Sequence, residues 1–397
     1  MNKKYSRFLV PGIIVVGIAL RVPFTAIPPI LNNIAKSQSI SVGQLGLLTT
    51  IPLIAFAIFS SFAPKIAHKF GLERAFSLVL GVTIIGSIVR VINTPMLYFG
   101  TLLIGIGIAH LNVLLPSIVR TYFPMKVGPI TSVFTFSMLL ATAVGSSVAV
   151  PITIATSWRV FIIILTIILV IALLLWLPNQ RFAQKYKRSS QQEQMLEPAP
   201  TIESSIWKNG YAWLLLFVCG MQSAMFYVSM AWIPTMAVQT GLSPSVAGVF
   251  SGVNSLIGLP FAIVIPIVIA NCSRKQRQVL MGIIAFTGVL GYILLLHPNG
   301  TFAYWLAVNL LIGVGTSGLF PYVLTTFNLK TNTPTQTAQL SGMVQSGGYL
   351  IAALGPALFG YGFSLFHSWA PQIIVILILF VLMIIAILIV EKKDKIL

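Results

Sequence analysis

The chain has 397 residues, of which 57% are hydrophobic and 8% are charged. Soluble proteins carry about 25% charged residues, so this composition excludes an ordinary soluble domain and indicates a polytopic membrane protein. A net charge of +18 would favour nucleic-acid binding in a soluble chain. Here the basic residues lie in connectors between apolar runs, so the membrane surface explains them and no nucleic-acid partner is expected.

Twelve apolar runs are each near the ~20 residues that a helix needs to cross a bilayer. A long polar stretch, residues 179–209, separates six runs from six. We therefore predict an all-α membrane protein with a six-helix bundle at 1–178, a cytoplasmic linker at 179–209 and a second six-helix bundle at 210–397. The predicted helices are 8–31, 44–64, 75–91, 97–119, 128–152, 158–178, 210–234, 246–269, 279–297, 302–327, 340–363 and 369–390.

The first run contains an arginine, Arg21, followed by Pro23, Pro28 and Pro29. At a rise of about 1.5 Å per residue, Arg21 lies roughly 20 Å into a core about 30 Å thick, where a cation costs at least about 2.5 kcal/mol. All six acidic residues fall outside the apolar runs. We predict that the partner of Arg21 is an anionic or strongly dipolar substrate. The alternatives are snorkelling to an interface or contacts with carbonyls that the prolines free.

Amide and aromatic side chains inside later runs are the next candidates for the substrate site. An amide inside a membrane either lines a cavity or bonds between helices, and both interpretations stay open here. Tyr349 follows Gln345 by four residues, so the two share one helix face. Aromatic residues in such runs also serve in packing or at the membrane interface. The candidate substrate-binding residues are Arg21, Asn112, Gln222, Gln345, Tyr349, Tyr227 and Trp232.

Two further residues of the fourth run are candidates for gating or coupling. His110, in its middle, could titrate near neutral pH and couple proton movement, or make a neutral hydrogen bond between helices. Arg120, at its end, could form a cytoplasmic gate or anchor the helix at the interface. Arg90 and Arg159, near the outer ends of the third and sixth runs, could attract anions or anchor the protein at the surface. Because the runs contain no carboxylate, the acidic proton relay of many symporters is missing.

The distribution of Lys and Arg predicts the orientation. Of the 24 such residues, Arg21 lies in the middle of a run, and Lys36, Arg90 and Arg159 lie in or beside one set of alternate connectors. All the others fall on the side of both termini. The positive-inside rule therefore places both termini and the central linker in the cytoplasm, in a multi-pass protein of the cell membrane.

The two halves repeat short patterns in the same order. The sequence LIGIG at 103–107 in the fourth run matches LIGVG at 311–315 in the tenth. Gly46 and Pro64 match Gly248 and Pro266 at a shift of 202 residues. These echoes favour a duplicated six-helix unit, with a substrate site near the midplane between the halves.

Longer motifs resemble a known family. They are A-L-R-x-P-x-T-A-x-x-P-x-L at 19–31, N-V-L-L-P at 112–116, G-M-Q-S at 220–223, G-L-F-P at 318–321 and L-S-G-M-V-Q-S-G-G-Y at 340–349. Together they resemble the cyanate porter and nitroimidazole transporter family of the major facilitators. The resemblance implies the major facilitator fold and transport of a small anion or small planar polar solute. His68 departs from the superfamily pattern, which has an aspartate there.

We therefore expect a monomeric secondary transporter that moves a small, cyanate-like anion or planar polar solute by alternating access of its two bundles. The alternative within transport is export of nitroimidazole-like or other small toxic compounds. A receptor would need a signalling domain, and an enzyme would need acid–base groups that the runs do not offer. With no phosphate-binding loop in the sequence, we expect neither ATP-driven transport nor a cofactor.

Overall fold

The computed structural model describes residues 5–38, 47–191 and 206–397. These residues form helices and no strands, which agrees with the predicted all-α class. The predicted start of the second helix at 44 and the middle of the predicted linker fall outside the described residues.

The first predicted helix is interrupted at Arg21. Its residues form α1 (Leu9–Ala19), the short α2 (Val22–Thr25) and the 3-10 turn η1 (Pro28–Ile30), which leads into α3 (Leu31–Gln38). Pro23 explains the first interruption, because it has no N–H to bond to the Ala19 carbonyl and its ring crowds that carbonyl. Pro28 and Pro29 interrupt the helical bonding again after α2 for the same reason.

The remaining predicted runs each correspond to helical segments. The following bounds complete the first half: α5 (Leu47–Phe59), η2 (Ser60–Phe62), α6 (Ala63–Phe70), α7 (Leu72–Val89), α8 (Thr94–Tyr122), α9 (Val127–Ala155) and α10 (Trp158–Gln191). The second half comprises η3 (Ile206–Lys208), α11 (Gly210–Gln239), α12 (Pro244–Asn271), α13 (Arg274–Leu294), α14 (Phe302–Ser317), α15 (Leu319–Leu329), α16 (Pro334–Phe366) and α17 (Ala370–Glu391).

Eleven helical segments in the described ranges are long and apolar enough to cross a bilayer, and the apolar stretch Leu256–Asn271 of α12 supplies a twelfth place. The sixth helix ends later than the sequence predicts, at 191 and not at 178. The helix α10 continues through Pro178 to Gln191, so the first part of the predicted linker at 179–209 is helical.

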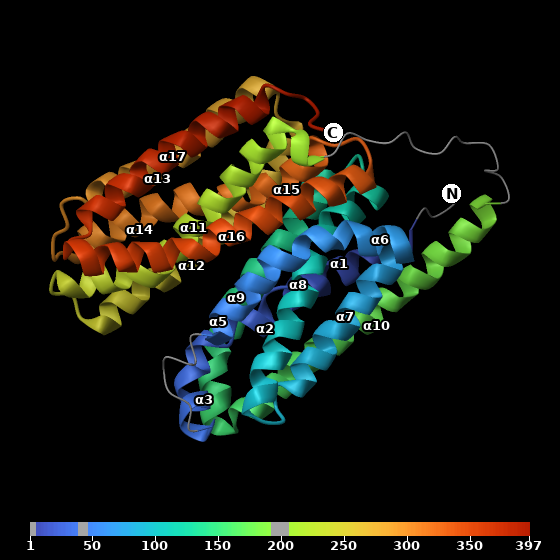
Figure 1. Ribbon diagram of the computed structural model, residues 1–397, viewed down its shortest axis with the longest axis horizontal. Helices are drawn as coiled ribbons and strands as arrows, with labels where there is room; N and C mark the ends of the chain where they lie inside the picture. The colour runs from blue at the N-terminus through green and yellow to red at the C-terminus, as the bar shows by residue number, and fades with distance from the viewer. Residues whose placement is uncertain (1–4, 39–46, 192–205) are drawn as a thin grey trace.

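The helices form two bundles, as Figure 1 shows. The first bundle contains α1 to α10 and the second contains α11 to α17. Both chain ends lie at the same side of the molecule, where the ring of Tyr5 packs on Phe123 and the amide of Asn332 donates to the carbonyl of Leu397. We call this the termini side. The two bundles are in contact at the termini side. They diverge toward their other ends, where α3 lies in the first bundle and α14 in the second.

The repeated glycine motif occupies the same kind of helix crossing in each bundle. In the first bundle, a Cβ added to Gly107 of α8 would lie 3.1 Å from the Cβ of Thr83 on α7. In the second, a Cβ added to Gly288 of α13 would lie 3.4 Å from the Cα of Gly315 on α14. Close backbone approach through small residues is how membrane helices gain packing without a hydrophobic driving force.

A buried charge cluster secures the second bundle at the termini side. Glu391, at the end of α17, accepts a hydrogen bond of 2.8 Å from the Tyr322 hydroxyl and lies 2.9 Å from the Nζ of Lys330. The Arg277 guanidinium lies 3.7 Å from the same carboxylate. Glu391 and Lys330 are only 1% and 2% exposed, so this ion pair is shielded from water.

We predict that Glu391→Gln destabilises the protein strongly, because Lys330 would then be a buried cation without its counter-charge. Removing one partner of a buried pair costs about 3–5 kcal/mol. Thermal unfolding of the purified protein in detergent would measure the loss. Asp394→Asn is the matched control, because Asp394 is exposed and pairs with the exposed Arg274 at 2.6 Å. Equal unfolding temperatures for the two variants would contradict the expectation.

Candidate functional site

The break at Arg21 is held by donors from other helices. Pro28 and Pro29 lack the N–H groups that would bond to Phe24 and Thr25, so those carbonyls lose their helical partners. The Thr25 carbonyl accepts instead from the Ser146 hydroxyl of α9 at 3.1 Å. The Pro23 carbonyl accepts from the Arg90 guanidinium at 2.9 Å. Both of these carbonyls are therefore occupied by groups other than Arg21.

The side chain of Arg21 reaches from the first bundle to the second. Its Cζ lies 5.2 Å from the centre of the Phe320 ring on α15. Its side chain is hydrogen-bonded to the Tyr227 hydroxyl of α11, and the Tyr349 hydroxyl of α16 also lies near it. Three of these four side chains, those of Arg21, Phe320 and Tyr227, are partly exposed.

The cation of Arg21 is incompletely satisfied. Its Nε is buried and has no hydrogen-bond partner among the described residues. The ion pairs found in those residues involve Arg274, Arg277 and Lys330, and none involves Arg21. A cation over an aromatic face gains about 0.5–2 kcal/mol, which does not replace a lost hydration shell. The group can therefore accept an anionic or electron-rich partner.

Two of the predicted amides bond to protein backbone. The Gln345 amide donates to the Asn112 carbonyl at 3.2 Å and to the Ser341 hydroxyl at 2.7 Å. The first of these bonds joins α16 to α8, so it crosses between the bundles. The Gln222 amide donates to the Thr316 carbonyl at 3.3 Å, which joins α11 to α14 inside the second bundle.

The structure groups some of the predicted aromatic residues and separates another. Tyr349 joins Tyr227 near Arg21, and its ring lies 5.0 Å from that of Phe56 on α5 in the other bundle. Trp232 lies apart from this group. Its indole N–H donates to the Pro356 carbonyl at 2.9 Å, and its ring lies 5.4 Å from that of Trp369.

The two candidates for gating or coupling occupy different environments. His110 is buried in α8, where its Nδ1 lies 2.7 Å from the Ile106 carbonyl one turn earlier and its Nε2 has no partner in the described ranges. Arg120 donates to the Asn332 carbonyl at 3.1 Å, so it links the first bundle to the connection between α15 and α16.

The bundles are joined by side-chain hydrogen bonds to backbone carbonyls at the termini side. Among the described residues, the donors and acceptors come from α5, α8 and α9 of the first bundle and from α12, the α15–α16 connection and α16 of the second. The donor and acceptor pairs are Arg120 with Asn332, Ser132 with Ile263, Thr135 with Ala262, Gln345 with Asn112, and Ser346 with Ala57. The structure is therefore a state in which the termini side is closed.

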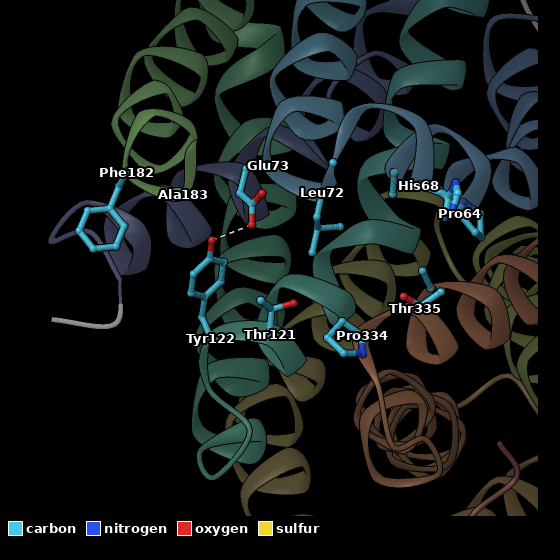
Figure 2. Close-up of a pocket in the computed structure, with 13 residues that line it drawn as sticks. Pro64, His68, Leu72, Glu73, Thr121, Tyr122, Phe182, Ala183, Pro334 and Thr335 are labelled. Carbon is cyan, nitrogen blue, oxygen red and sulfur yellow. Dashed lines mark hydrogen bonds between the residues drawn. The ribbon is translucent and has the colours of Figure 1, made fainter. Parts of the chain in front are cut away.

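A cavity of about 590 Å³ lies away from Arg21, at the termini side (Figure 2). Its walls come from α6, α7, α8 and α10 of the first bundle and from the start of α16. Within it, the Tyr122 hydroxyl donates to the Glu73 carboxylate at 2.6 Å, and His68 lies on the wall beside Pro64. The cavity thus lies at a contact between the bundles and does not include the Arg21 group.

Two residues near the break were not expected from the sequence. Phe320 belongs to the G-L-F-P motif, whose aromatic position was the available signal, but its proximity to Arg21 depends on how the bundles meet. The surface roles considered for Arg90 are wrong, because its side chain is 2% exposed. Arg159 does lie at an exposed position, where it donates to the Val91 carbonyl at 3.1 Å.

Comparison with known proteins matches residues 9–356 to the Major Facilitator Superfamily. The chain is 34% identical to the uncharacterized transporter YycB of Bacillus subtilis (strain 168), over 96% of this chain and 93% of YycB. It is 33% identical to a 2-nitroimidazole transporter of Escherichia coli (strain K12), over 96% and 95% of the two chains.

More distant matches agree in fold. The cyanate transport protein CynX of Escherichia coli (strain K12) is 20% identical over 87% of each chain. Among solved structures, the proton:xylose symporter XylE superposes with a TM-score of 0.76 at 13% identity, over 97% of this chain and 95% of XylE. At that identity the likeness shows the fold alone.

We predict that cysteines at Ala57 and Ser346 form a disulfide under mild oxidation, after Cys219 and Cys272 are replaced by serine. The Ser346 hydroxyl bonds to the Ala57 carbonyl, and a disulfide needs Cα atoms within about 7 Å. Loss of labelling by a polyethylene-glycol maleimide would report the bond. Ala57→Cys with Leu354→Cys, two turns further along α16, is the control. Free thiols in both pairs would contradict the closed contact.

Proposed function

Because the chain belongs to the major facilitator superfamily and is a multi-pass membrane transporter of the secondary type, we propose that it carries a small, planar, electron-rich solute. The family and the fold are those of transporters and not of enzymes.

The observation that carries the proposal is the unpaired cation of Arg21 between the bundles. Its buried Nε has no partner, and the described chain offers it no carboxylate. Such a charge in a membrane is costly, and a solute that brings a negative or electron-rich edge lowers that cost. In a transporter whose two bundles meet at this residue, the cation is suited to bind cargo and release it again.

The neighbours of Arg21 favour a flat solute. The Phe320 ring offers a face for stacking, and the phenols of Tyr227 and Tyr349 can donate hydrogen bonds to oxygen atoms of a nitro or carboxylate group. The 33% identity to a 2-nitroimidazole transporter, over nearly the whole of both chains, supports a substrate of this kind. We propose Gln222 and Trp232 as outer contacts only, because both donate to backbone carbonyls of the second bundle.

Alternating access would follow from opening of the termini side. In this proposal the side-chain bonds of Arg120, Gln345 and Ser346 to the opposite bundle break when that side opens. Gln345 and Asn112 would then be free to contact the passing solute. The two neutral bonds each cost about 0.5–1.5 kcal/mol to lose and the bond of Arg120 about 1.5–3 kcal/mol, so substrate binding can shift the balance. We place the termini side in the cytoplasm on the distribution of Lys and Arg, with the protein in the cell membrane.

A second candidate substrate is cyanate or a similarly small inorganic anion. The isolated charge of Arg21 fits a full negative charge, and CynX is related at 20% identity. Phe320→Leu separates the two candidates. This substitution should weaken binding of 2-nitroimidazole by removing the ring face, and it should leave cyanate nearly unaffected because cyanate has no ring to stack.

We predict that Arg21→Ala lowers uptake of 2-nitroimidazole, nitrate or cyanate into proteoliposomes at least about tenfold, since a hydrogen bond to a charged group is worth about 1.5–3 kcal/mol. Arg21→Lys should recover part of the uptake, because it keeps the charge but not the planar fork. Arg159→Ala removes a cation from an exposed position and is the matched control. Undiminished uptake by a stably folded Arg21→Ala protein would refute the assignment.

A further inference from the structure

A second buried arginine lies next to the break in the first membrane segment. Arg90 follows the end of α7 and is 2% exposed. Its Nη1 donates to the Pro23 carbonyl at 2.9 Å, and its Nε donates to the Thr101 hydroxyl at 3.0 Å. Thr101 in turn donates to the Leu97 carbonyl at 2.6 Å, so the acceptor is itself fixed. No described ion pair includes Arg90.

The packing of α7 against α8 leaves room for this side chain. A Cβ added to Gly100 would lie 2.8 Å from the Cγ of Arg90 and would also meet the Gly86 carbonyl. A Cβ added to Gly86 would lie 2.8 Å from the Gly100 carbonyl. Both distances are below those that real side chains adopt, so any larger residue at Gly100 would displace the stem of Arg90.

Arg90 remains a cation at neutral pH. A guanidinium gives up its proton only far above neutral pH, so burial does not neutralise it. A charged donor makes a stronger hydrogen bond than a neutral one, so its bond to the Pro23 carbonyl is correspondingly firm. Burying a charged side chain is costly, and a neutral amide could also donate to the Pro23 carbonyl. Packing alone therefore does not explain why an arginine stands at this position.

We propose that Arg90 is a positioning residue for the substrate site, because it holds the Pro23 carbonyl and thereby fixes where Arg21 points. Pro23 lies two residues after Arg21, and the helical turn between the breaks, α2, is only four residues long. Arg90 holds one end of this turn through Pro23, and Ser146 holds the other through Thr25. Without the first of these bonds, the turn can rotate about the break, and the Arg21 guanidinium moves with it.

This inference rests on the proposed role of Arg21, but one test needs no substrate. In a protein without native cysteines, Arg21→Cys would be modified with the anionic reagent 2-sulfonatoethyl methanethiosulfonate, in the absence of ligand. Adding Arg90→Met should change the modification rate at least about fivefold, as expected for loss of a charge-assisted bond. Adding Arg159→Met, which removes an exposed cation, should leave the rate within about twofold.

The second test is a double-mutant cycle on the apparent KM for 2-nitroimidazole and nitrate uptake. Arg90→Met should raise KM about tenfold when Arg21 is present and have no further effect in Arg21→Ala. Arg90→Lys should also raise KM, because the ammonium group of lysine lacks the planar set of donors that reaches both the Pro23 carbonyl and the Thr101 hydroxyl. If Arg90→Met fails to fold, Thr101→Val replaces it as a milder variant. It removes one of the two acceptors of Arg90 and should raise KM about threefold.

The outcomes separate this inference from the proposed function. If Arg21→Ala leaves uptake unchanged, the proposed function fails, and the cysteine rates still decide the role of Arg90. Unchanged cysteine rates in Arg90→Met overturn the positioning role; if that variant cannot be purified, unchanged rates in Arg90→Lys and Thr101→Val do so. Wild-type KM in Arg90→Lys with a raised KM in Arg90→Met would assign the effect to charge alone and would also overturn it.

Discussion

The structure depends on one uncompensated charge at one break in a membrane segment. Arg21 ends the helical course of α1, and the described chain brings no carboxylate to it. A cation in such a place is tolerated only if backbone, aromatic faces, water or a solute share its charge. Here two neighbouring backbone carbonyls are taken by Arg90 and Ser146, which leaves Arg21 the Phe320 ring, the Tyr227 hydroxyl and a buried Nε that has no partner among the described residues.

The same break links local chemistry to the arrangement of the bundles. Arg21 belongs to the first bundle, but the aromatic groups around it belong to the second. The hydrogen bonds that join the bundles lie at the termini side and run from side chains to backbone carbonyls. Four of these five bonds are neutral and individually weak, and the fifth is donated by Arg120, so two packings of the bundles can differ by only a few kcal/mol. The unpaired cation of Arg21 favours binding of a solute between the bundles, and the weak hydrogen bonds between the bundles favour its release on the other side. Both features therefore favour transport.

Much of the fold followed from the sequence, because length and apolarity fix where a chain can cross a bilayer. The isolation of Arg21 was also predictable, since the apolar runs contain no acid. Its prolines left open an unwound helix or a simple kink, and the first helix was predicted as continuous over 8–31, whereas the structure interrupts it. The position of Arg90 was not. It lies at the end of a run and looked like a surface residue, and only the close crossing at Gly86 and Gly100 buries it. The pairing of Phe320 with Arg21 likewise depends on how two distant bundles meet, which no local pattern encodes.

The most direct measurement is a structure of the protein with 2-nitroimidazole or nitrate bound. The account predicts ligand density within hydrogen-bond distance of the Arg21 guanidinium, against the Phe320 ring and the Tyr227 hydroxyl. Density confined to the termini-side cavity of Figure 2, with the Arg21 guanidinium turned onto backbone carbonyls or lipid, would contradict it.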